Sequence, residues 1–293
     1  MKNMMSNILV LLLVLGANAC KVADIRTSNL KQQESTSEKG RNVLEASIKA
    51  MGYDHLNNYK TYSAKSVFEW KPFWSMMPMN ALPGNKNKEI EFHFSTNSFD
   101  GRVNYFKGRK KGDYHGIQSW QTYQSVDGKP LKFQKDKRRS WGLASYHYMT
   151  EAPNRLLNAP IIKYGGTTNM YGKAYDLVFA TWGTVEANKK YDQWLLYINK
   201  ETKFIDLAQL TIRDFFLPFP PNLSHGTVQY LSRKEVNEVH LPTEVAIQMF
   251  APKKQEKYAY KFKLYDYKFD SLHIDELYPN PKLERLGDSK ISK

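Results

Sequence analysis

The sequence predicts a β-rich α+β domain, and its aromatic content, its alternating segments and its length support this. The chain has 293 residues, of which 19 are Tyr, 15 Phe and 6 Trp, and aromatic side chains favour pleated, half-buried sheets. Residues 61–70, 90–94 and 257–270 alternate apolar and polar side chains, as strands with one buried face do. A domain of this length folds without disulfides or a metal, and the single cysteine permits no internal disulfide.

Residues 1–19 have the pattern of a signal peptide. Lys2 supplies a positive charge, and residues 8–15 form an apolar run shorter than the roughly 20 residues of a spanning helix. Two products remain open, because an ordinary signal peptidase recognises A-x-A at 17–19, whereas lipoprotein processing acylates Cys20. A free N-terminal thiol is a reactive liability, which favours lipidation.

The segment before Cys20 resembles the lipobox of bacterial lipoproteins, with Ala17 where leucine is commonest. The resemblance implies a diacylglyceryl thioether on Cys20 and an acylated amine, and several acyl chains anchor stably where one is marginal. Lys21 follows the cysteine, and the absence of Asp there indicates the outer membrane by the sorting rule of enteric bacteria. We therefore expect a lipid-anchored outer-membrane protein on the periplasmic or cell-surface side.

Beyond the signal peptide the chain divides into three parts. Residues 20–37 are polar and without periodicity, so they are expected to be the lipidated N-terminus and a flexible tether. Residues 38–281 form one predicted domain, and residues 282–293 form a polar tail. A helix is expected over 38–51, where apolar residues recur at helical spacing and Gly52 provides a left-handed end.

Three finer features are predicted. Residues 35–38 have the S-x-x-E form of a capping box for the first helix. A second helix is expected over 137–151, ended by Pro153. Within 257–270 the alternation slips by one residue, which indicates either a β-bulge near Leu264–Tyr265 or a strand covered on its other face in its second half. Further strands, the fourth and fifth of which form a hairpin, are expected at 102–107, 115–124, 175–182, 191–199, 204–214, 226–232 and 242–250.

Two loops are unusually apolar. Residues 71–84 read KPFWSMMPMNALPG, and their three prolines preclude regular structure. Residues 214–223 read DFFLPFPPNL. Such loops plug the domain's own core, cover an apolar cavity or touch a membrane. In the second of these interpretations the ligand-binding residues are Trp70, Phe73, Trp74, Met76, Met77, Phe215 and Phe216.

The sequence shows no catalytic motif. It lacks G-x-S-x-G, H-E-x-x-H, C-x-x-C and a phosphate-binding glycine loop, and its seven histidines are scattered. We therefore expect no enzyme, no metal and no cofactor. The net charge is +14, or +13 after residue 19, which favours anionic partners such as phospholipid headgroups, or only a soluble, solvated surface. Export disfavours nucleic acid as a partner, and the oligomeric state stays open.

Four short segments resemble the lipoprotein-localisation-factor (LolA/LolB-like) superfamily, and more closely the outer-membrane lipoprotein-sorting-like proteins of Bacteroidetes. They are 44–53 (LEASIKAMGY), 153–157 (PNRLL), 197–205 (YINKETKFI) and 239–245 (VHLPTEV). The resemblance implies a curved antiparallel half-barrel sheet with helices packed on its concave side, enclosing an apolar cavity in which carriers bind acyl chains. The chain departs from LolA in its lipid anchor, its extra length and its proline-rich loops.

The preferred interpretation is a membrane-tethered, non-enzymatic lipoprotein that binds a lipid or other apolar ligand in a cavity of the sheet. The first alternative is an envelope scaffold that binds a protein or glycan partner through exposed aromatic residues. The second is a hydrolase whose site residues lie far apart in the sequence and meet only in the fold.

Overall fold

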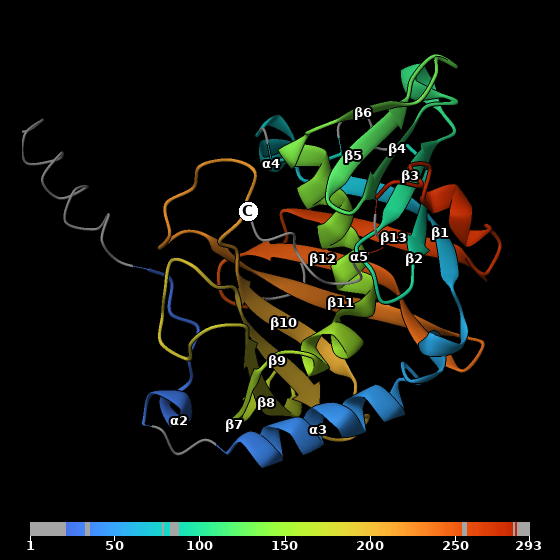
Figure 1. Cartoon of the computed structure of the whole chain (residues 1–293). Coiled ribbons are helices and arrows are strands. Elements are labelled where there is room, and N and C mark those ends of the chain that lie inside the picture. The colour runs from blue at the N-terminus through green and yellow to red at the C-terminus, as the bar shows by residue number, and fades with distance from the viewer. Residues whose placement is uncertain are drawn as a thin grey trace, which may run out of the picture.

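The protein is a β-rich α+β structure built on one curved, unclosed sheet (Figure 1). The computed structural model describes residues 22–285 except 33–35, 78, 83–87, 254–256 and 284. The predicted signal peptide, Cys20 and the end of the tail lie outside the described residues, as does Ser35 of the predicted capping box. None of the helices in the described part is long and apolar enough to cross a bilayer.

Thirteen strands pair antiparallel in the order β6-β5-β4-β3-β2-β1-β13-β12-β11-β10-β9-β8-β7. Their bounds are β1 Thr61–Trp70, β2 Ile90–Ser95, β3 Gly101–Tyr105, β4 Tyr114–Gln118, β5 Gln121–Ser125, β6 Lys132–Gln134, β7 Ile161–Met170, β8 Lys173–Thr181, β9 Gln193–Asn199, β10 Ile205–Thr211, β11 His225–Val236, β12 Val239–Met249 and β13 Tyr260–Phe269. The α-helices are α2 Ser28–Lys31, α3 Ser37–Ala50, α4 Pro72–Met76 and α5 Lys137–Leu157, and the 3₁₀ turns are η1 His55–Asn58, η2 Gly108–Lys110 and η3 Ile274–Leu277.

The order of the strands divides the sheet into two meanders joined at its centre. Strands β1 to β6 run outward to one edge, α5 crosses the sheet, and β7 to β13 return from the other edge. The two halves meet where β13 pairs with β1, with Phe68 opposite Phe262. The sheet is thereby complete only when the first and last strands are both present.

Helix α5 fills the concave side of the sheet (Figure 1). The Tyr146 ring lies 5.1 Å from that of Phe68, 5.6 Å from Phe92 and 5.4 Å from Phe262, which brings strands from both meanders onto one helix. Helix α3 packs on the same side near β7, and its Leu44 belongs to the same apolar core. The implied half-barrel with helices on its concave side is therefore confirmed.

The prediction that Pro153 ends the second helix is wrong, because α5 continues to Leu157. A proline has no N–H to donate to the carbonyl four residues earlier, and that carbonyl belongs to Met149. The Tyr230 hydroxyl donates to it instead, at 2.9 Å. The Tyr53 hydroxyl donates to the next carbonyl, that of Thr150, at 2.8 Å. Side chains from the surrounding structure thus replace the bonds that the proline disrupts.

The N-terminal segment, residues 22–32, lies against the outer face of the sheet, whereas the sequence indicated a flexible tether there. Ile25 and Leu30 are buried against β8, β9 and β10, in a cluster that includes Phe179 and Leu195. Burying two such side chains stabilises the attachment by roughly 3–6 kcal/mol. The sequence did not predict this contact because four polar residues separate Ile25 from Leu30.

Three local predictions need correction or refinement. The single strand expected at 115–124 is the hairpin β4–β5, because Ser119 and Trp120 adopt φ values of 48° and 63° and turn the chain. Regular structure does occur in the loop at 71–84, since Pro72 starts the short helix α4, as proline at a first helical position favours. The expected bulge in β13 is present, two residues along, at Asp266 with φ 54°.

Candidate functional site

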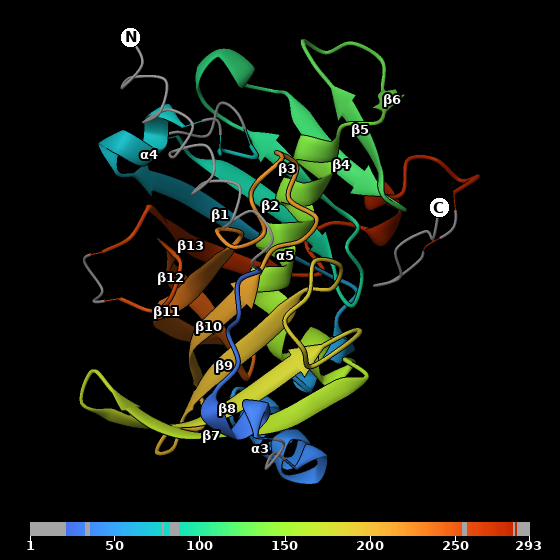
Figure 2. The same cartoon turned by 90° about the vertical axis from the view of Figure 1, so that its left-hand side faces the viewer.

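Four loops lie together at one end of the strands and form what we call the open rim. They are the described residues within 71–89, 182–192, 212–224 and 250–259, which connect β1–β2, β8–β9, β10–β11 and β12–β13. The register places their strand ends side by side, as in the pairs Thr181–Gln193 and Trp70–Tyr260. The rim lies on the left in Figure 1 and faces the viewer in Figure 2.

The open rim carries most of the exposed apolar surface of the described residues. Among the described residues nine large apolar side chains are exposed, and six of them belong to these loops: Phe73, Met76, Met77, Trp182, Phe219 and Leu223. Exposed apolar groups concentrated on one side of a protein mark a ligand, partner or membrane contact. The rim is therefore the candidate site.

Both apolar loops contact the first turns of α5. In the second loop, Phe215 packs against Trp141 at 4.8 Å and the Trp141 indole N–H donates to Asp214 at 3.3 Å. In the first loop, the Asn80 carbonyl accepts a 2.8 Å hydrogen bond from Arg138 Nε. The Arg138 guanidinium also lies 5.5 Å from the Phe216 ring. Helix α5 thus links two loops that are far apart in sequence.

A hollow of about 360 Å³ opens within the rim between α5 and the 212–224 loop. Its apolar wall comes from the loop, including Phe215, Phe216 and Phe219. Three cationic side chains, Lys137, Lys189 and Arg213, surround that wall. An apolar wall beside positive charge suits an amphiphile with an acyl chain and an anionic head.

Arg213 is the innermost of these cations. Burial lowers its pKa, while the charge of Asp192 opposes the shift. Its guanidinium donates to the Pro221 carbonyl at 2.8 Å and to the Ala23 carbonyl at 3.3 Å. Arg213 therefore connects the loop that lines the hollow to the N-terminal segment.

The predicted ligand-binding residues fall into three environments. Trp70 is buried in the core, stacked on Tyr260 at 4.2 Å, and Trp74 packs against the same core. Phe215 and Phe216 line the hollow. The exposed set on α4 and directly after it consists of Phe73, Met76 and Met77. Six of the seven residues belong to the open rim, Trp70 ends the strand that leads into it, and no single cavity contains them all.

Sequence reasoning missed the charged and helical parts of the site. Lys137, Lys189 and Arg213 reach the hollow from α5 and two different loops, and no local pattern connects them. Trp141 was detectable as a large aromatic near the start of a predicted helix. In the described part of the chain, no group of three or more His, Cys, Asp or Glu is arranged to hold a metal ion.

Comparison with known proteins gives similarity in fold. No protein-family model matches the sequence, and no curated protein matches it. A DUF1329 family protein from Desulfovibrio piger superposes with a TM-score of 0.50 at 8% identity, over 85% of this chain and 99% of that one. The similarity concerns the fold alone.

Two further solved structures align less well. A LolA superfamily protein from Nitrosomonas europaea has a TM-score of 0.47 at 8% identity, over 78% of this chain and 94% of its own. A domain assigned to outer membrane lipoprotein sorting, from Vibrio parahaemolyticus, has a TM-score of 0.49 at 8% identity, over 84% and 98%. TM-scores below 0.5 support no conclusion about this chain, so its function has to be argued from its own rim.

Proposed function

We propose that this protein is an envelope lipoprotein, anchored in the outer membrane through acylated Cys20, that binds a lipid or other apolar ligand at its open rim. The observation that carries the ligand part is the hollow at the start of α5, which Phe215 and Phe216 line together with three cationic residues. The anchor is supported by the sequence before Cys20. The proposed activity is binding, without chemical conversion of the ligand.

The concave side of the sheet is a less favourable location for the ligand. Tyr146 of α5 packs tightly against Phe68 and Phe262 there, so a ligand would have to displace the helix. The rim hollow needs no such displacement, since half-buried loop residues form its wall. These contacts favour the open rim over the space under α5 as the location of the ligand.

Lipid binding is tested on protein purified in its acylated form from membranes. Native mass spectrometry is expected to show a co-purifying lipid, and fluorescent lysophosphatidylglycerol is expected to bind. The double variant Phe215→Ser/Phe216→Ser should lose most binding, whereas Tyr265→Ser, an exposed aromatic change outside the hollow, should not. Absence of lipid and equal probe binding by all three proteins would contradict the proposal.

The anchor is tested separately by the intact mass of the mature protein. The expected product begins at Cys20 and carries the mass of its acyl chains. A mature product with an unmodified cysteine, or with the leader intact, would remove the anchor from the proposal. Neither result would change the binding measurement.

A further inference from the structure

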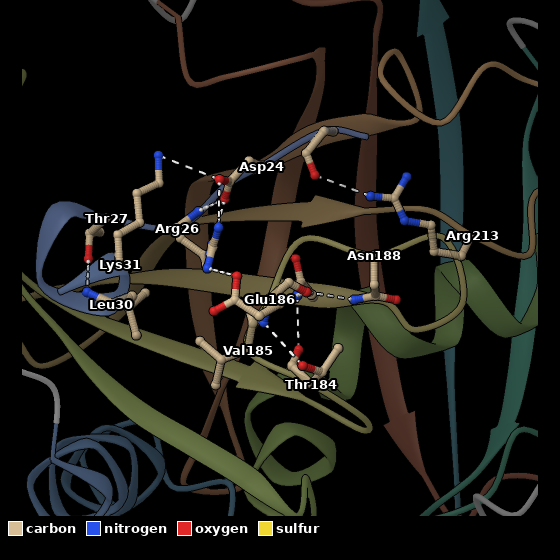
Figure 3. Close-up of polar contacts among 12 residues, drawn as sticks. Asp24, Arg26, Thr27, Leu30, Lys31, Thr184, Val185, Glu186, Asn188 and Arg213 are labelled. Atoms are coloured by element: carbon tan, nitrogen blue, oxygen red, sulfur yellow. Dashed lines mark hydrogen bonds and ion pairs between the residues drawn. The ribbon is translucent and has the colours of Figure 1, made fainter. Parts of the chain in front are cut away.

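The N-terminal segment begins at the open rim. The Ala23 amide donates a 3.1 Å hydrogen bond to the Pro221 carbonyl, and the same carbonyl accepts from Arg213. Pro221 belongs to the loop that lines the hollow. The first described residues are therefore joined directly to the candidate site (Figure 3).

Polar contacts hold this segment firmly to the outer face of the sheet (Figure 3). Arg26 forms ion pairs with Asp24, at 3.0 Å, and with Glu186 of the 182–192 loop. Burial would raise the pKa of Asp24, but the hydrogen bonds and charge of Arg26 outweigh it and lower that pKa. Gln193, itself buried, donates to the carbonyls of residues 184–186 and fixes the part of the loop that Arg26 reaches.

Chain length then limits where the anchor can be. Only Lys21 separates Cys20 from Val22. Because an extended chain spans at most about 3.3–3.6 Å per residue, the Cα atom of Cys20 lies within roughly 7 Å of that of Val22. If Cys20 carries acyl chains in the bilayer, the rim lies at the membrane surface.

The charge of the molecule agrees with this orientation. Among the described residues of the four rim loops, seven are Lys or Arg and four are Asp or Glu. The loops at the other end of the strands, which we call the opposite edge, have four Lys or Arg and seven Asp or Glu. They are residues 51–60, 96–100, 200–204, 237–238 and 270–283. An anionic membrane therefore attracts the rim and repels the opposite edge.

We propose that the open rim is a docking surface for an anionic lipid membrane, and that the N-terminal segment holds the domain against the bilayer in this orientation. Phe73, Met76 and Leu223 enter the interfacial region, and the rim lysines contact the headgroups. The hollow then opens toward the bilayer, so an amphiphile passes between the two without crossing water. The proposal rests on the lipid anchor of the proposed function and adds an orientation and a surface to it.

Labels placed at single cysteines test the orientation in the full acylated protein, because its only native cysteine is the acylated one. The protein is reconstituted in phosphatidylcholine vesicles containing phosphatidylglycerol, and a spin-labelled lipid quenches the fluorophore. Labels at Met76→Cys and Leu223→Cys are expected to be quenched several-fold more than labels at Asp54→Cys and Glu276→Cys on the opposite edge. Equal quenching at the four positions would overturn the docking.

A flexible Gly-Ser linker inserted between Lys21 and Val22 tests the role of the N-terminal segment. The linker leaves the folded domain and the anchor intact but no longer limits the distance between them, so quenching of the rim labels should fall. Unchanged quenching would show that the segment does not orient the domain.

A soluble Cys20→Ser form separates the rim from the anchor. It is expected to sediment with vesicles containing phosphatidylglycerol, and the triple change Phe73→Ser/Met76→Ser/Leu223→Ser should reduce this several-fold. The control double change Leu272→Ser/Ile274→Ser alters half-buried apolar groups at the opposite edge and should not. If the rim labels stay unquenched while lysophosphatidylglycerol still binds, this inference fails and the proposed function stands. If the rim labels are quenched but lysophosphatidylglycerol does not bind, the docking stands and the ligand-binding part of the proposed function fails.

Discussion

The Tyr230 hydroxyl donates a hydrogen bond to the Met149 carbonyl at 2.9 Å, in place of the backbone N–H that Pro153 lacks. Tyr230 is buried in β11, so this bond ties the middle of α5 to the sheet. A proline inside a helix is tolerated when another donor satisfies the freed carbonyl. The bond is therefore part of what allows α5 to cross the whole sheet.

The loss of stability on removing the Tyr230 hydroxyl should depend on Pro153. Tyr230→Phe is expected to lower the free energy of unfolding by about 1–3 kcal/mol, because it leaves a buried carbonyl unsatisfied. In a Pro153→Ala background the new N–H supplies the missing donor, so the same change should cost less. Urea denaturation of the double-mutant cycle measures the coupling. Tyr175→Phe, whose hydroxyl contacts Asp206 on the outer face, should cost the same in both backgrounds, and a coupling of zero for Tyr230 would refute the replacement.

Stability should fall in mild acid because of His147. Burial lowers its pKa to about 4, although Glu151 opposes the shift, so the folded protein keeps the imidazole neutral. The unfolded chain has the ordinary value near 6.5 and takes up a proton first. The free energy of unfolding should therefore decrease between pH 6.5 and 4.5, by up to about 1.4 kcal/mol per pH unit.

Denaturation of His147→Gln at pH 7 and pH 5 checks this assignment. The variant should be less stable at pH 7, because it loses the stacking on Phe94 at 4.1 Å. Its stability should depend less on pH than that of the wild type. The control His273→Gln changes an exposed histidine and should keep the wild-type slope. A wild-type slope in His147→Gln would place the acid sensitivity elsewhere, with buried His115 as the next residue to test.

Glu151 depends on Arg155 inside the apolar core. Both side chains are almost fully buried and lie 2.8 Å apart, and burial of Glu151 is offset by the charge of Arg155, which lowers its pKa. Arg155→Met removes the cationic partner of the buried carboxylate and should destabilise the protein by about 3–5 kcal/mol. The second change Glu151→Gln should restore part of this loss. Urea denaturation that showed no such recovery would argue against the ion pair as the cause.

Helix α3 requires Gly40 where it approaches strand β7. A Cβ there would lie 2.6 Å from the backbone carbon of Lys163. Gly40→Ala should therefore destabilise the fold by about 1–3 kcal/mol through overpacking, despite the roughly 1 kcal/mol that alanine gains in helix propensity. Glu45→Ala, at an exposed position of the same helix, is the matched control. Thermal unfolding in which Gly40→Ala is as stable as the control would contradict the close approach.

Strands with one buried face could be predicted from the sequence, whereas β7 could not. The alternation in β1 and β13 is strong, and both were found at their predicted positions, with the bulge in β13 displaced by two residues. Strand β7 contains Gly165 and Gly166, with a register shift there, followed by threonines. Adjacent glycines are typical of loops, and only pairing with β8 makes this segment a strand.

The candidate site was predictable in its apolar part only. The composition of 71–84 and 214–223 singled out both loops, because aromatic and methionine side chains are unusual beside prolines. Their meeting at the first turns of α5, through Trp141 and Arg138, depends on tertiary packing that no local pattern shows. Arg213 was not identified because its partners, Ala23 and Pro221, come from opposite parts of the chain.

The pairing of β1 with β13 has a consequence for how the chain matures. Until the last strand is synthesised, β1 and β12 each present an unpaired backbone edge at what becomes the middle of the sheet. Such edges pair readily with other chains. The unfinished chain is therefore prone to aggregation until synthesis reaches Phe269, and a product truncated before β13 keeps two unpaired edges.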